Sequence, residues 1–188
     1  MSTLIIRAAA IAFITLAAAA AHAQRAVQDQ TAVEAITLFQ HSCLPFAGMP
    51  AALRDWVARK NFVAVPSTTA TAFLGGEPGQ AWWASTPDVK MVLVSNDTGA
   101  CRILMAHGDK ANVDQALQDY FVSIGSPATK VYDKASPDGE THQTLLTAAF
   151  RDRTWLVSTT THSKDDAPGE KPMLIILTTS RARGGPHP

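Results

Sequence analysis

The residues Lys90–Gly125, KMVLVSNDTGACRILMAHGDKANVDQALQDYFVSIG, decide the fold of this chain. Two aliphatic runs, Met91–Val94 and Ile103–Met105, flank a turn-like segment from Ser95 to Gly99. Asn and Asp hydrogen-bond to their own backbone in turns, and Gly allows positive φ, so we expect a β-hairpin here. The runs are apolar at consecutive positions, which predicts a sheet that is covered on much of both faces.

The residues after this hairpin predict an amphipathic helix. Asp109 or Asn112 can cap its start, and Gly125 followed by Pro127 can end it. A hairpin that leads into a helix is typical of a layered α+β domain. The apolar side chains recur at the helical period and form a single stripe: Val113, Ala116, Leu117, Tyr120, Phe121 and Ile124.

Residues 1–23 have the pattern of a signal peptide. Arg7 precedes an apolar, Ala-rich run, and Ala21-His22-Ala23 is a small-x-small cleavage signal, so we expect the mature chain to begin at Gln24. No later stretch approaches the roughly 20 apolar residues that span a bilayer, so we expect no membrane anchor after cleavage. The pattern predicts a protein of the periplasm or a secreted protein. The alternative is a buried N-terminal helix.

The charges of the chain are balanced. It has 16 basic and 16 acidic residues, and only Arg7 lies in the predicted signal peptide, which leaves 15 basic against 16 acidic residues in the mature part. A nearly neutral surface gives no electrostatic reason to bind nucleic acid or anionic lipid. We therefore expect no nucleic-acid partner.

The two cysteines, Cys43 and Cys101, predict a disulfide, because paired cysteines are usual in an oxidising compartment. This bond would tie the end of an N-terminal helix to the second strand of the hairpin. The alternative is a catalytic thiol or a metal pair. The sequence has neither C-x-x-C spacing nor a histidine cluster to support that alternative.

The rest of the chain predicts further helices and strands. Thr31 to Glu34 is a capping-box pattern that opens a short helix with Val33, Ile36 and Phe39 on one stripe. Met49-Pro50 opens another, with Leu53, Trp56 and Val57 on its apolar side. Strands are expected at 81–84, 130–132, 142–150, 154–162 and 172–179, and the last four form an antiparallel meander.

The fold class that follows is α+β. We expect one antiparallel sheet of about five to six strands, with the N-terminal helices and the central amphipathic helix packed on it. Residues 24–180 form a single domain, and residues 181–188 have no apolar content and are expected to be a disordered tail.

One segment is a candidate binding surface. Phe73 lies near a glycine-rich loop, and Trp82 and Trp83 follow it in a predicted strand. Alternation along a strand puts one tryptophan in the core and the other outside, where it can contact a sugar, a peptide or a partner. The sequence does not decide which one is exposed, and a loop that covers the ring is the alternative.

His107 lies where the second strand leads into the helix and is a further candidate site residue. A polar ring before a helix can serve in a site, although capping or loop positions more often explain it.

No motif identifies a reaction. The sequence has no H-x-H, no H-E-x-x-H and no G-x-S-x-G, and the glycines at 75–79 lack phosphate-loop spacing. We therefore expect no catalytic residue, metal or cofactor. The favoured hypothesis is a non-enzymatic binding or accessory protein with an envelope or secreted protein as partner. The alternatives are an exported hydrolase that uses His107 and a structural envelope protein.

Three motifs resemble those of an uncharacterised family of small exported proteobacterial proteins. They are F-x-x-x-C from Phe39 to Cys43, F-L-G-G-x-x-G-x-x-W from Phe73 to Trp82, and T-G-x-C from Thr98 to Cys101. The resemblance covers about residues 32–125. It implies export, one α+β domain and a bond between Cys43 and Cys101, and it implies no catalytic residues.

Overall fold

The computed structural model of the chain describes residues 30–106, 108–150, 153–162 and 175–181. The predicted signal peptide, His107 and residues 182–188 of the predicted tail lie outside the described residues. Arg181, where we expected the tail to begin, is the last residue of a strand.

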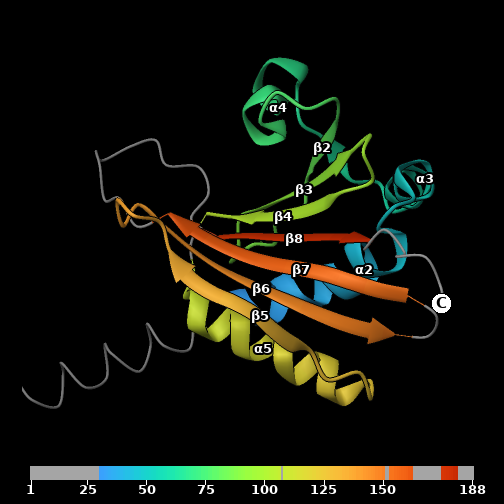
Figure 1. Cartoon of the computed structure of the whole chain (residues 1–188). Coiled ribbons are helices and arrows are strands. Elements are labelled where there is room, and N and C mark those ends of the chain that lie inside the picture. The colour runs from blue at the N-terminus through green and yellow to red at the C-terminus, as the bar shows by residue number, and fades with distance from the viewer. Residues whose placement is uncertain (1–29, 107, 151–152, 163–174, 182–188) are drawn as a thin grey trace, which may run out of the picture.

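Eight antiparallel strands form one sheet in the order β1-β2-β3-β4-β8-β7-β6-β5 (Figure 1). The α+β class is thus as expected, but the sheet is larger than five to six strands, partly because β1 is only two residues long and has no pattern of its own. The strands are β1 (Val63–Ala64), β2 (Gly79–Trp83), β3 (Met91–Asn96), β4 (Cys101–Met105), β5 (Thr129–Ala135), β6 (Thr141–Phe150), β7 (Arg153–His162) and β8 (Ile175–Arg181).

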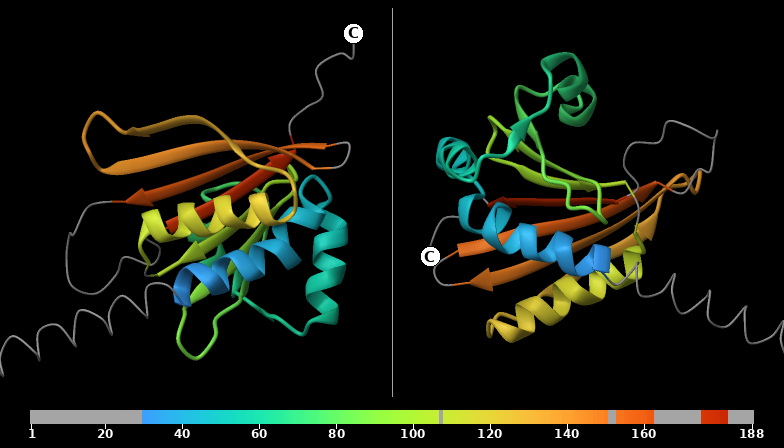
Figure 2. Two further views of the ribbon diagram at one scale, coloured as in Figure 1. Left: turned by 90° about the horizontal axis from the view of Figure 1, so that it is seen from below. Right: turned by 180° about the vertical axis from the view of Figure 1, so that it is seen from behind.

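The helices cover the two faces of the sheet unequally. A helix over residues 30–41 and α5 (Lys110–Ser123) lie side by side on one face, as both views in Figure 2 show. The short α2 (Cys43–Phe46) and α3 (Pro50–Arg59) continue from the first helix. The opposite face carries α4 (Ser67–Leu74), which lies over β2 and β3.

Two apolar cores result from this arrangement. The larger core lies under the helix of residues 30–41 and α5, and includes Phe39, Leu93, Ile103 and Phe121. The smaller core lies under α4, where Phe73 packs with side chains from the other face of the hairpin strands. Every residue of β3 is buried, as the consecutive apolar positions predict.

The amphipathic helix α5 forms as the sequence predicts. The Asp109 carboxylate caps its start and accepts hydrogen bonds from the backbone N–H groups of Ala111 and Asn112 at 2.7 and 3.1 Å. Leu117 and Phe121 are among the fully buried side chains of its apolar stripe. The cap fixes the first turn of α5, and the buried stripe packs the helix against the sheet.

Cys43 and Cys101 form a disulfide, with their Cα atoms 5.2 Å apart. Both residues are buried, and the bond joins the first residue of α2 to the first residue of β4. The N-terminal helix breaks one residue before the cysteine, at Ser42. The Ser42 hydroxyl donates to the carbonyl of Leu38 at 2.6 Å. A disulfide is compatible with an oxidising compartment.

Within the described ranges, no helix has the length and apolar content that crossing a membrane requires.

Candidate functional site

A groove of about 620 Å³ lies between the helix of residues 30–41, the end of α3 and the neighbouring ends of β2 and β3. Its volume falls within the range of small-molecule binding sites. Figure 2 shows α3 standing across the end of the first helix, and Trp56 near the end of α3 lines the groove. The apolar lining consists of Val33, Leu38, Trp56, Phe62, Ala84 and Met91, and the polar lining of Gln30, Glu34, Thr37, His41, Lys60 and Thr86.

Aromatic rings form one wall of the groove. The ring centroids of Trp56 and Phe62 are 5.6 Å apart, and Phe46 lies behind Trp56 at 6.1 Å. Leu53 and Val57 of α3 are fully buried, whereas Trp56 is only partly buried. The core therefore covers only part of the apolar side of α3, and the uncovered part, at Trp56, faces the groove.

Val33 corrects an expectation from the sequence. The helical stripe places it with Ile36 and Phe39 on the buried side, but its side chain is 55% exposed, whereas Ile36 and Phe39 are buried. Val33 lies one turn before Ile36, where the side chain is directed to the groove instead of the core. An apolar residue is thus left open at the wall of the groove.

The polar groups of the groove differ in how they are bonded. The Glu34 carboxylate accepts hydrogen bonds from Gln30 Nε2 at 2.9 Å and from the Thr86 hydroxyl. Lys60 and His41 form no ion pair or side-chain hydrogen bond with any described residue. The acidic group of the groove is therefore already bonded, and the basic groups are available.

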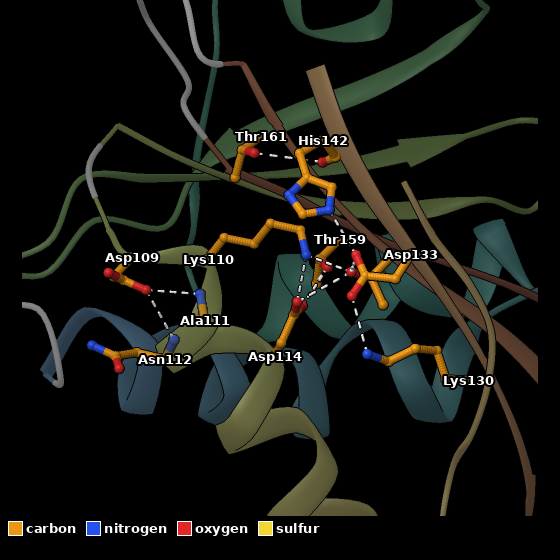
Figure 3. A network of polar contacts seen from close by, with 11 residues as sticks. Asp109, Lys110, Ala111, Asn112, Asp114, Lys130, Asp133, His142, Thr159 and Thr161 are labelled. Atoms are coloured by element: carbon orange, nitrogen blue, oxygen red, sulfur yellow. Dashed lines mark hydrogen bonds and ion pairs between the residues drawn. The ribbon is translucent and has the colours of Figure 1, made fainter. Parts of the chain in front are cut away.

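A second polar cluster joins α5 to the sheet (Figure 3). Lys110 pairs with Asp114 on the next turn of α5 and also donates to the hydroxyl of Thr144 on β6. Thr159 on β7 donates to the other oxygen of Asp114. Thr144 and Thr159 are almost completely buried, so these contacts fix the start of α5 on the strands.

Asp133 on β5 extends this cluster. Its carboxylate accepts from Lys130 Nζ at 3.0 Å and contacts His142 Nε2 at 2.7 Å. The hydrogen bond from Lys130 is the main reason that the pKa of Asp133 is lowered from 3.8 to about 2, and hydrogen bonds from Thr144 and His142 act in the same direction.

The cluster does not have the arrangement of a nucleophilic site. His142 contacts Asp133, but in the described part of the chain no hydroxyl or thiol is bonded to its other ring nitrogen. A Ser-His-Asp type of mechanism requires that third contact. Since the charged groups also bond to one another, the cluster holds the start of α5 on the sheet.

Of the predicted binding residues, Trp82 lies on one face of the sheet, and Phe73 and Trp83 lie together on the other. Trp82 and Trp83 point to opposite faces, as strand alternation requires: Trp82 is 7% exposed and belongs to the larger core, whereas Trp83 is 39% exposed. Phe73 is a buried residue of α4 and contacts the Trp83 ring edge-on, with centroids 5.8 Å apart. Of these three residues only Trp83 is at the surface.

Val63 is the neighbour of Trp83. The two residues are paired across β1 and β2, and Val63 is 67% exposed. They form a small apolar patch at the edge of the sheet, outside the groove. We call Trp83 and Val63 the edge patch.

Metal binding finds no support in the described residues, where no three His, Cys, Asp or Glu side chains lie close enough together to hold an ion.

Comparison of the chain with protein-family models, curated proteins and solved structures gives no match. The function therefore has to be inferred from the geometry of the groove and the edge patch.

Sequence reasoning missed the groove. A local signal exists in Trp56, Lys60 and Phe62, where two aromatic residues flank a cation at the end of α3. That signal does not reveal that the N-terminal helix and Met91 complete the walls, because those residues come from distant parts of the chain.

Proposed function

We propose that this chain is an exported binding protein without catalytic activity of its own, and that the groove is its ligand site. The observation that carries the proposal is the combination of an open apolar wall with basic groups that have no partner among the described residues. Small-molecule sites are typically concave and mostly apolar, with a few polar groups that orient the ligand.

Export is the first part of this proposal. The signal-peptide pattern supports it, and the buried disulfide is compatible with it. Mass spectrometry of the protein recovered outside the cytoplasm tests this part. We expect a chain that begins at Gln24 and contains no free thiol. Retention of residues 1–23, or two free thiols, would contradict it.

The ligand site is the second part. Mature protein is screened against a library of small molecules by ligand-observed NMR. We expect binders that compete with one another and lose affinity in Val33→Gln and Trp56→Ala. Val122→Gln is the control, because Val122 is also an exposed helical valine, at 64%, but lies on α5 away from the groove. Binders that persist in both groove variants would place the site elsewhere.

Enzymatic activity is the main alternative. An exported hydrolase would use His107 with a nearby Ser, Asp or Glu. A panel of esterase, peptidase, glycosidase and amidase substrates, repeated with His107→Ala, separates this alternative from a binding protein. Turnover that the variant loses would overturn our preference.

The edge patch supports a second candidate function, which is binding of an envelope or secreted protein. Exposed aromatic residues often anchor protein interfaces, and truncating one can cost about 2 kcal/mol or more of binding free energy. A structural envelope protein would instead have no single stoichiometric partner. A pull-down from envelope extract distinguishes these two possibilities.

The two tryptophans supply a matched pair of variants for the edge patch. Trp82→Ala should lower the free energy of unfolding by ~3–5 kcal/mol, because it empties a core position. Trp83→Ala should leave the melting temperature nearly unchanged and abolish capture of the partner. If Trp83→Ala unfolds the protein as Trp82→Ala does, then the ring is a packing element and the edge patch is not an interface.

A further inference from the structure

We infer that the ligand of the groove is a small hydrophobic carboxylate whose anionic group pairs with Lys60 and whose apolar body lies against Trp56 and Phe62. This inference rests on the proposed function and specifies the class of ligand. It follows from the charges and the apolar wall of the groove.

The charge of the ligand follows from which charged side chain of the groove has no partner among the described residues. Glu34, the acidic side chain in the lining, already accepts from Gln30 and from Thr86. Both donors are neutral, so Glu34 keeps its negative charge, but each of its oxygens already has a hydrogen-bond donor, and Lys60 would repel a cationic ligand. The Lys60 ammonium has no partner among the described residues, so an anion can bind it without breaking an existing contact.

His41 supplies a second donor that an anion can use. It lies at the end of the first helix, lines the groove and has no side-chain partner in the described part of the chain. A neutral imidazole still has one ring N–H, which can donate to a carboxylate oxygen.

The body of the ligand follows from the wall. Trp56 and Phe62 form a tilted aromatic pair, and Val33 across the groove remains open to solvent. An aliphatic chain or a ring placed there removes apolar surface from water, which favours binding. The volume of about 620 Å³ suits one compact molecule.

The experiment compares three probes that share one apolar chain and differ in charge: octanoate, 1-octanol and octyltrimethylammonium. Their affinities for the mature, oxidised protein are measured by isothermal titration calorimetry. We expect octanoate to bind about tenfold more tightly than 1-octanol, which corresponds to about 1.4 kcal/mol. Octyltrimethylammonium should bind more weakly than either.

Two charge variants test the role of Lys60. In Lys60→Gln we expect the affinity for octanoate to fall to that for 1-octanol, while the affinity for 1-octanol stays the same. Arg59→Gln is the matched control, because it removes the same charge from the neighbouring residue, which does not line the groove. It should retain the preference for octanoate. Equal losses in the two variants would mean that overall charge, not a contact with Lys60, sets the preference.

The remaining outcomes distinguish a wrong ligand class from a wrong binding site. If octanoate and 1-octanol bind equally to the wild type and both weaken in Val33→Gln, then the groove binds ligands but the inferred class is wrong. Tighter binding of octyltrimethylammonium would also overturn the class. If none of the three probes binds, both the inference and the groove as a ligand site for apolar molecules are overturned.

Discussion

Individual glycines explain much of the motif pattern that precedes β2 and β4. Gly75 has φ +63° and ends α4 in the left-handed conformation. A Cβ on Gly79 would lie 2.4 Å from the carbonyl oxygen of Ser95, and a Cβ on Gly99 would lie 2.8 Å from the Cα of Gly48. These positions therefore require glycine for backbone geometry and close approach, so the motifs describe the fold and not a reaction.

Gly99 allows a direct test at the residue scale. It has φ +92° and touches Gly48, whereas Gly76 has φ +81° and a Cβ added there would have no atom within 4 Å. Both alanine variants carry backbone strain, but only Gly99→Ala adds a clash, which typically costs a further ~1–3 kcal/mol. Urea unfolding should therefore show a clearly larger loss of stability for Gly99→Ala. Equal losses would show that the contact with Gly48 adjusts freely.

At the scale of elements, two devices hold the helices on the sheet. The disulfide fixes α2 to β4, and the polar cluster of Lys110, Asp114 and the buried threonines fixes the start of α5 to β6 and β7. The disulfide acts just after the end of the helix of residues 30–41, and the polar cluster acts at the start of α5, so each helix over the larger core is anchored at one end.

Removal of the disulfide should be costly. The bond closes a loop with a sequence separation of 58, for which chain entropy gives a stabilisation of about 4 kcal/mol. We expect the Cys43→Ala/Cys101→Ala double variant to lose most of this free energy in urea unfolding. Wild type measured in a reductant is the control for packing effects of the substitutions. A loss below about 1 kcal/mol would contradict the chain-entropy account, in which the bond stabilises the fold by restricting the unfolded chain.

Asp133 should make stability depend on acid pH. Its pKa in the folded state is about 2 against an ordinary 3.8, so the folded state favours the ionised carboxylate. The resulting stability is present above about pH 4 and is lost as the pH falls through about 2. Because the side chain is largely exposed and screened, we expect less than ~1 kcal/mol.

Urea unfolding at pH 4.5 and pH 2.5 measures this effect. Asp133→Asn should lose less stability between the two pH values than the wild type does, since one carboxylate no longer titrates. Asp55→Asn, which changes an exposed carboxylate on α3, is the control and should follow the wild type. Identical pH profiles for Asp133→Asn and the wild type would contradict the role of Asp133.

The sheet consists of two sets of four neighbouring antiparallel strands, β1-β2-β3-β4 and β5-β6-β7-β8. Helical structure precedes each set, and in the first set α4 is inserted between β1 and β2. The last strands of the two sets, β4 and β8, pair with each other, and the larger core takes side chains from both sets. The two sets are therefore joined by backbone hydrogen bonds and by a common core.

This joint predicts that the first four strands, with their helices and α5, do not fold alone. A chain of residues 24–128 would leave β4 without β8 and would uncover the apolar stripe of α5, which packs against β7. We expect this fragment to show no cooperative transition in thermal or urea unfolding followed by circular dichroism. The full mature chain, measured in parallel, should unfold in one transition. A cooperative transition in the fragment would show that the first four strands form an independent domain.

The sequence by itself determined the local parts of this protein. Turn chemistry and apolar period located the β3–β4 hairpin, α5 with its Asp109 cap and the strands of the second set, because each signal involves residues within a few positions of one another. The pairing of the two cysteines followed from their number, and the opposite directions of Trp82 and Trp83 followed from strand alternation.

Only the tertiary structure decided the parts that depend on distant neighbours. Helical period placed Val33 on a stripe with Ile36, but whether that stripe is covered depends on α3, Phe62 and Met91, which arrive from other elements. The same holds for the pairing of β4 with β8. It also holds for the bond between Glu34 and Thr86 and for Lys60, which has no partner among the described residues. Periodicity gives the direction of a side chain, whereas its partners are set by the packing of the whole chain.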